Sequence, residues 1–386
     1  MKIPFNKPLV LGSEIEYLKQ EIEKDRFSEK GEFTSKCAEL IEKETSCNKV
    51  IMTPSCTSAL EMCALLCSIK PGDEVIMPSF THPGTANPFV RAGAEIVWCD
   101  IKEDTKNIDE DKIRPLITKR TKAVVAVHYG GIICRMDKIA SICKKNHLYM
   151  IEDAAMAIGS RFKDQPAGSF GDLAVISFHK TKNVQCGEGG ALLINNQNMI
   201  ERAEFLRDYG TNRIHFEKGL IEKYTWIEKS SNFSMSELQA AYLYPQLLEL
   251  KRINENRLRT WKLYYKLLSE FLPVKCLSYI PKEVKHNAHL FYIMLKNEEQ
   301  RKELITHLKS TGVQAFFHYV PLHSAPIWKE KYDNISLPVT DKVSETLLRL
   351  PMYYNMQKEE VEYVVLMLCK KLFPLVVPAE VGIREH

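Results

Sequence analysis

The sequence predicts an α/β protein with a large domain on a mostly parallel sheet and a smaller α+β domain after it. Through the first half of the chain, short apolar runs alternate with stretches of helical length, which is typical of parallel strands joined by right-handed crossover helices. The strand-like runs are apolar throughout, as expected for strands that are covered on both faces. The chain has 386 residues, more than one hydrophobic core usually supports. We therefore expect domains at 1–245 and 246–386.

The expected elements follow in chain order. Two polar helices come first, Glu14–Lys24 and Thr34–Glu44, with Thr34 as the N-cap of the second. Strands are expected at Lys49–Met52, Glu74–Met77, Glu95–Cys99, Ala123–His128, Leu148–Ile151, Asp172–Ile176 and Ala191–Ile194, with helices at Ala59–Ser68, up to Arg91, at Asp109–Ile117 and at Met136–Asn146. From Ser236 the pattern predicts one long helix to about Phe271, then a strand Leu290–Leu295, a helix Glu298–Ser310, a strand Val313–Phe317 and a helix Lys358–Leu372. The weakly patterned tail Pro374–His386 is expected to be mobile.

Composition and charge exclude several function classes. The formal net charge of +4 is too small to indicate nucleic acid or a membrane surface as a partner. The first residues do not resemble a signal peptide, and no apolar run is long enough to span a bilayer. Eleven cysteines are scattered without CxxC pairs, which favours buried free thiols over disulfides or a metal site. We therefore expect a cytoplasmic protein without a metal.

The most informative stretch is Ser177–Gly190, which reads SFHKTKNVQCGEGG and lies between two apolar runs. Two buried strands joined by a glycine-bent loop place Lys180 and Lys182 at the floor of a site. A partly desolvated lysine has a lowered pKa and can form a covalent bond to a carbonyl carbon. The alternative is a solvated basic loop, which is the ordinary state of a lysine.

Three other segments follow predicted strands, where ligands collect in a parallel sheet. Ser55–Ser58 opens a helix, so its N–H groups suit a phosphate, although it could equally be an ordinary N-cap. Asp153 could keep a ring nitrogen protonated or cap a helix. His82 could stack on an aromatic cofactor or be an ordinary histidine. Together with a lysine, these groups are what pyridoxal 5′-phosphate requires.

Several motifs in a fixed order resemble those of the DegT/DnrJ/EryC1/StrS family of sugar aminotransferases. They are IPFNKP, TPSCTSALEM, GDEVIMPSFT, VHYGG, IEDAA, SFHKTKN with GEGG, YGTNR, SELQAAYL, FHYVPLH and LRLP. The resemblance covers about Ile3 to Leu372. It implies the aspartate-aminotransferase type of fold (fold type I), with pyridoxal 5′-phosphate as the cofactor.

The resemblance assigns roles to individual residues. It makes Lys182, rather than Lys180, the lysine that binds the cofactor covalently and transfers protons, and it pairs Asp153 with the pyridine nitrogen. It places the phosphate on the backbone of Cys56 and Thr57 and on the hydroxyl of Ser177. It also implies that His82 stacks on the ring. Asn232 would reach the phosphate of the neighbouring subunit, so the resemblance implies a homodimer with composite active sites.

Three positions depart from the family pattern. Met156 stands where the family often has a glutamine that contacts the cofactor's ring oxygen, and methionine cannot donate that hydrogen bond. Cys56 replaces a common glycine, and His82 replaces a larger aromatic residue. None of these changes removes a reacting group.

The implied reaction transfers an amino group from L-glutamate, which leaves as 2-oxoglutarate, to a nucleotide-linked 4-keto-6-deoxyhexose. Candidates for binding the sugar's diphosphate are Arg213, His318, Tyr319 and His323. The alternatives are a 3-keto-sugar aminotransferase, a sugar dehydratase of the same family and a non-enzymatic regulator. Family dehydratases carry histidine in place of the lysine, so Lys182 argues against that activity. No helix-turn-helix pattern supports the regulator.

Overall fold

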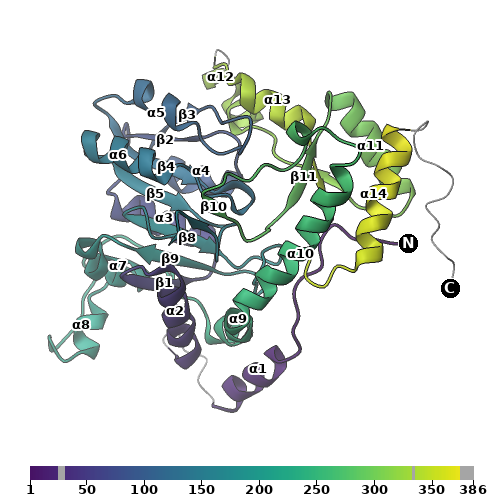
Figure 1. Ribbon diagram of the computed structural model, residues 1–386. Coiled ribbons are helices and arrows are strands. Elements are labelled where there is room, and N and C mark those ends of the chain that lie inside the picture. The colour runs from purple at the N-terminus through teal and green to yellow at the C-terminus, as the bar shows by residue number, and fades with distance from the viewer. Residues whose placement is uncertain (25–30, 333–334, 374–386) are drawn as a thin grey trace.

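The computed structural model describes residues 1–24, 31–332 and 335–373 (Figure 1). The predicted tail Pro374–His386 lies outside the described residues. A seven-stranded sheet with the order β1-β9-β8-β5-β4-β2-β3 forms the centre of the larger part. Strands β8, β5, β4, β2 and β3 run parallel to one another, whereas β9 runs antiparallel to both β1 and β8. The predicted α/β class with a mostly parallel sheet is therefore confirmed.

The element bounds agree with most of the expected ranges. The strands are β1 Lys49–Thr53, β2 Glu74–Pro78, β3 Glu95–Cys99, β4 Thr121–Val127, β5 Tyr149–Asp153, β6 Arg161–Phe162, β7 Gln165–Pro166, β8 Leu173–Ser177, β9 Gly190–Ile194, β10 Val284–Lys285, β11 Phe291–Met294, β12 Phe316–Phe317 and β13 Leu347–Leu350. The helices are α1 Glu14–Glu23, α2 Glu32–Thr45, α3 Cys56–Leu66, α4 Pro83–Arg91, α5 Glu110–Ile113, α6 Met136–Asn146, α7 Ile200–Arg207, α8 Arg213–Glu217, α9 Glu237–Leu248, α10 Leu250–Leu268, α11 Glu298–Ser310, α12 Lys329–Tyr332, α13 Pro338–Thr346 and α14 Lys358–Leu372. None of the helices among these residues has the length and apolar character needed to cross a membrane.

Both faces of the central sheet are covered, which explains its apolar strands. Alternate residues of β4 enter different cores: Val124 packs with α2, α6 and α9, whereas Val125 packs with α3, α4 and α7. Successive side chains of a strand point to opposite faces, so a strand buried on both sides must be apolar throughout. The carboxyl ends of the parallel strands are left at one edge, where loops can gather polar residues.

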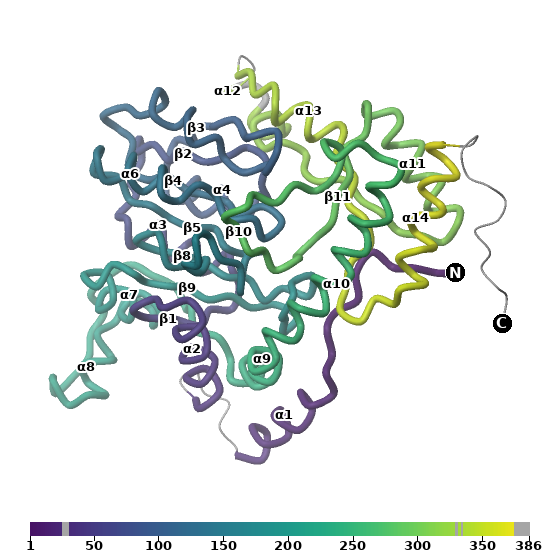
Figure 2. Tube along the Cα trace, viewed as in Figure 1, coloured from purple at the N-terminus to yellow at the C-terminus, as the bar shows by residue number. Residues whose placement is uncertain are grey.

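The C-terminal part has its own core around a three-stranded antiparallel sheet, β11-β13-β12. The long helix α10 leads into the C-terminal part, where α14 packs against both α10 and α11 (Figure 1). The N-terminal segment returns to this part, because Ile3 pairs with Val313 and is buried in the same core. Figure 2 shows this purple segment running from α1 to the green and yellow elements. The domain division at residue 245 stays a prediction.

Three expected elements were wrong in detail. Helix α2 begins at Glu32 with Gly31 as its N-cap, so Thr34 lies inside the first turn, where its hydroxyl donates to Gly31 O at 3.2 Å. The long helix is two helices, α9 and α10, that meet at Glu249. Pro245 lies in the last turns of α9, where a proline removes a backbone hydrogen bond and crowds the preceding turn. In the stretch 313–317, only Phe316–Phe317 forms a strand.

Candidate active site

The loop between β8 and β9 carries both predicted lysines. It is closed by backbone hydrogen bonds from Lys180 N to Gly187 O at 2.9 Å and from Lys182 N to His179 O at 2.8 Å. Gly187 has φ +80°, a conformation that side chains rarely adopt, so the turn requires a glycine there. Lys180 is exposed, whereas Lys182 is only partly exposed. The loop therefore turns one lysine to solvent and the other into the protein.

Lys182 lies within electrostatic reach of several predicted site residues. Removal from water lowers the pKa of its amine below the usual value of a lysine. The charge of Asp153 opposes this shift, and that of Arg349 reinforces it. A lowered pKa leaves more of the amine neutral near pH 7, and the neutral form is the one that can act as a nucleophile or base.

The start of α3, where the phosphate site is predicted, lies beside this loop. Ser55 is the N-cap and accepts a hydrogen bond from Ser58 N at 3.1 Å, so the amides of Cys56 and Thr57 have no partner within the helix. Gly190 packs directly against them, since a Cβ there would lie 2.4 Å from Cys56 N. Ser177 is the residue opposite Gly190 across the β8–β9 pair. The predicted phosphate-binding groups thus meet at one place.

Asp153 ends β5 and is buried with its carboxylate held in place. The hydroxyl of Thr85 donates to Oδ2 at 2.7 Å, and the amide of Ala155 donates to Oδ1 at 3.2 Å. Thr85 lies in α4, whose N-cap is His82. A Cβ at Gly84 would lie 2.9 Å from His82 Nδ1 and 3.1 Å from Thr57 Oγ1, so His82 is adjacent to the phosphate-binding helix.

These groups fit pyridoxal 5′-phosphate. Unpaired amides at a helix N-terminus suit its phosphate, and a buried carboxylate suits its ring nitrogen. The partly exposed Lys182 lies within electrostatic reach of both Cys56 and Asp153. Met156 does not fill the place of the family's donor: its sulfur accepts a hydrogen bond from Gly130 N at 3.4 Å.

Two of the predicted sugar-binding residues join this site. The rings of His318 and Tyr319 are stacked, with centroids 3.8 Å apart. His318 Nδ1 lies 3.3 Å from the Tyr129 hydroxyl, and Tyr319 packs edge-on against Phe80, just before His82. His323 is buried instead as a link between elements, with Nδ1 2.8 Å from Ser79 Oγ and Nε2 3.4 Å from Asp341.

The remaining predicted residues, Arg213 and Asn232, belong to the segment 208–232. This segment includes α8, which stands apart from the sheet in Figure 1. Arg213 pairs with Glu217 at 3.1 Å and with Asp208 at 3.8 Å. Asn232 is exposed, forms a β-bridge with Asp208 and accepts from Ser234 N at 3.0 Å. Within one chain, α8 therefore places Arg213 away from the lysine loop.

Sequence reasoning missed Arg349 and Tyr129 as site residues. Arg349 lies in β13 and donates a hydrogen bond to His318 Nε2. Tyr129 is buried and follows β4. Both residues belong to quoted motifs, LRLP and VHYGG, so the motifs themselves were the available signal.

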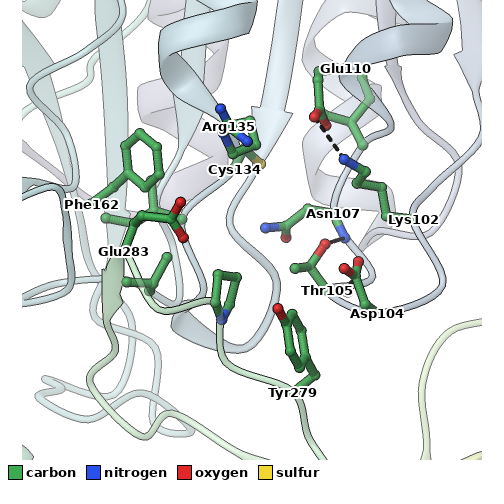
Figure 3. A pocket seen from close by; sticks show the side chains of 14 residues that line it. Lys102, Asp104, Thr105, Asn107, Glu110, Cys134, Arg135, Phe162, Tyr279 and Glu283 are labelled. Atoms are coloured by element: carbon green, nitrogen blue, oxygen red, sulfur yellow. Dashed lines mark hydrogen bonds and ion pairs between the residues drawn. The ribbon is translucent and has the colours of Figure 1, made fainter. Parts of the chain in front are cut away.

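A separate pocket of about 260 Å³ is shown in Figure 3. Its lining includes Lys102, Asp104, Glu110 and Tyr279, and none of the predicted site residues. Asn107, which also lines it, accepts from the amide of Tyr129 at 2.9 Å. Asn107 thus links the lining of this pocket to the backbone of Tyr129.

The family of this chain follows from comparison with known proteins. Residues 11–369 match the DegT/DnrJ/EryC1/StrS aminotransferase family. The uncharacterized protein MJ1066 of Methanocaldococcus jannaschii is 32% identical over 86% of this chain and 88% of its own length. The spore coat polysaccharide biosynthesis protein SpsC of Bacillus subtilis is 29% identical over 94% of this chain and 95% of its own.

Solved structures agree with this assignment. The crystal structure of the aminotransferase TlmJ from Streptoalloteichus hindustanus superposes with a TM-score of 0.88 at 25% identity, covering 97% of this chain and all of that one (100%). The fold is therefore that of the pyridoxal phosphate-dependent aminotransferases, fold type I, as the motifs implied. The chain belongs to the DegT/DnrJ/EryC1/StrS family of sugar aminotransferases, and pyridoxal 5′-phosphate is its cofactor.

Proposed function

We propose that this enzyme transfers the amino group of L-glutamate to C4 of a nucleotide-linked 4-keto-6-deoxyhexose. The favoured substrate is dTDP-4-dehydro-6-deoxy-D-glucose, and the product is a 4-amino-4,6-dideoxy sugar such as dTDP-4-amino-4,6-dideoxygalactose. The observation that carries the proposal is the desolvated amine of Lys182, which lies within electrostatic reach of Cys56 at the start of α3 and of Asp153. The polysaccharide role named for SpsC supports a product destined for a surface polysaccharide.

Each residue of the site has a distinct task. Bound pyridoxal phosphate supplies a carbonyl carbon that can hold an amine and a ring that accepts electrons when a C–H bond breaks. Lys182 Nζ takes the proton from Cα of glutamate and, in the second half of the reaction, gives one to C4 of the sugar. Asp153 keeps the ring nitrogen protonated, and the amides of Cys56 and Thr57 hold the phosphate.

The proposal is tested by supplying both substrates. The purified enzyme is incubated with glutamate and either dTDP- or UDP-4-keto-6-deoxyglucose, and the product is solved by NMR. We expect an amine at C4 and the release of 2-oxoglutarate. Amination of a 3-keto sugar supplied in parallel, with no amination of either 4-keto sugar, would instead identify a 3-keto-sugar aminotransferase, and loss of the C3 hydroxyl without amination would identify a dehydratase.

We also propose that the enzyme is a cytoplasmic homodimer with shared active sites. All eleven cysteines are free thiols, which fits a reducing compartment. The segment 208–232 exposes large apolar side chains that a second copy could cover, including Tyr209 at 52%, Leu220 at 67% and Trp226 at 66% exposure. Asn232 lies at the end of this segment, where it could reach the phosphate site of the partner.

Mixing two inactive variants should restore activity if the sites are shared. Lys182→Ala and Asn232→Trp each disable every site of their own dimer. After subunit exchange, a mixed dimer has one site with both lesions and one with neither, so roughly a quarter of wild-type activity should return in an equal mixture. The measurement is turnover before and after exchange, with exchange itself followed by mass. Complete exchange without any recovery would mean that Asn232 acts within its own chain or not at all.

A further inference from the structure

Arg349 carries a guanidinium group that no carboxylate neutralises in the part of the chain that the structure describes. The residue lies in the middle strand of the C-terminal sheet, opposite Tyr292 on one side and Phe316 on the other. Within residues 1–24, 31–332 and 335–373, no carboxylate forms an ion pair with it, and its Nε is buried without a hydrogen-bond partner. The ring of Phe5 lies 4.6 Å from the guanidinium carbon. A charge held in this way is costly unless an anion joins it.

His318 does not supply a negative charge to Arg349, but it connects Arg349 to a second hydrogen-bond donor, the hydroxyl of Tyr129. Arg349 donates to His318 Nε2, so the ring proton lies on Nδ1 and points to the Tyr129 oxygen at 3.3 Å. Burial and the charge of Arg349 lower the pKa of His318 well below its usual range, which keeps the ring neutral. The hydroxyl of Tyr129 accepts from this histidine and retains its own proton for a ligand.

Comparison with Arg257, which also has a buried guanidinium group, indicates that Arg349 is the arginine available to a ligand. Arg257 donates through Nε to Ala288 O at 3.1 Å and through a terminal nitrogen to His289 O at 2.6 Å. Those bonds fix Arg257 within the protein, whereas Arg349 is partly exposed. Its charge also lowers the pKa of Lys182, so it lies within electrostatic reach of the reacting amine.

We propose that Arg349, with Tyr129 beside it, binds the α-carboxylate of the amino donor. This inference rests on the proposed function. The α-carboxylate is bonded to the same carbon as the reacting amine, so its receptor must lie close to Lys182. The diphosphate of a nucleotide sugar is attached at C1, across the ring from C4, and therefore lies farther from the lysine. The planar fork of a guanidinium also matches a carboxylate with two parallel hydrogen bonds.

The test separates the two halves of the reaction. The cofactor-loaded enzyme is mixed with glutamate alone, and its absorbance change is followed. In Arg349→Gln, the glutamate concentration for half-saturation should rise about 30-fold or more, with a smaller rise in Arg349→Lys. The amine-loaded variants should still react with the keto sugar at an unchanged half-saturating concentration. The matched control is Arg252→Gln in α10, where the arginine side chain is 60% exposed.

A binding measurement without turnover accompanies the kinetics. Glutarate, a dicarboxylate that lacks the amine, is titrated calorimetrically into the cofactor-loaded wild type and variants. We expect its affinity to fall in parallel with that for glutamate. Circular dichroism checks that each variant is folded. A test without variants uses 4-aminobutanoate, which is glutamate without its α-carboxylate, and the wild type should react with it far more weakly.

Each other outcome overturns a different statement. Unchanged glutamate and glutarate affinities in Arg349→Gln, or equal reaction with 4-aminobutanoate, would refute the carboxylate site. A loss confined to the keto-sugar half-reaction would assign Arg349 to the diphosphate instead. A wild type that does not react with glutamate at all would overturn the proposed amino donor, whatever the variants do.

Discussion

Replacement of Lys182 by alanine is expected to abolish turnover, while Lys180→Ala stays active. The Lys182 amine combines covalent attachment with proton transfer, and positioned proton transfer alone contributes about 10²–10⁴-fold to a rate. We therefore expect a loss of about 10⁴-fold or more in the combined assay. Lys180 is a matched control, because it lies in the same loop but is exposed to solvent.

A chemical measurement identifies the lysine directly. Borohydride reduction of the wild-type enzyme traps the bond between the cofactor and the protein, and peptide mapping should then find the cofactor on Lys182 alone. Equal losses in the two alanine variants, or label on Lys180, would contradict the assignment. Because reduction and mapping require no turnover, this result does not depend on having the correct sugar.

Asp153→Asn is expected to retain the fold and to lose most of the activity. Two donors, the Thr85 hydroxyl and the Ala155 amide, form hydrogen bonds to the carboxylate and fix its position. The neutral amide would no longer keep the ring nitrogen protonated, and loss of one preorganised charge-stabilising group costs about 10²–10³ in turnover. The measurement is the rate of the glutamate half-reaction, with circular dichroism as the check on folding.

The control for this variant is Asp164→Asn. Asp164 is 78% exposed and pairs with Lys285 on the surface, so its replacement should leave the rate unchanged. Near wild-type rates in Asp153→Asn would refute the role of this carboxylate. A fall in both variants would point to a general effect of lost negative charge rather than to the ring nitrogen.

Local sequence determined the α/β class and the place of the chemistry in it. The apolar runs identify strands because a strand that is covered on both faces has apolar residues at nearly every position. The Ser55–Ser58 turn and Asp153 each follow such a run, and Lys182 lies between two of them. Since the carboxyl ends of parallel strands meet at one edge, their convergence could be expected from the order of elements alone.

The tertiary structure decided those features that depend on contacts between residues far apart in the sequence. The antiparallel insertion of β9 between β1 and β8 and the break at Glu249 leave no clear trace in hydrophobic periodicity. The environment of Arg349 is set by Phe5 and His318, residues that lie far from it in the sequence. Periodicity reports how deeply a residue is buried, but it cannot report whether a buried charge has found a counter-charge. That question is decided only when distant segments pack together, and here the packing of the described segments leaves the guanidinium of Arg349 without a counter-charge.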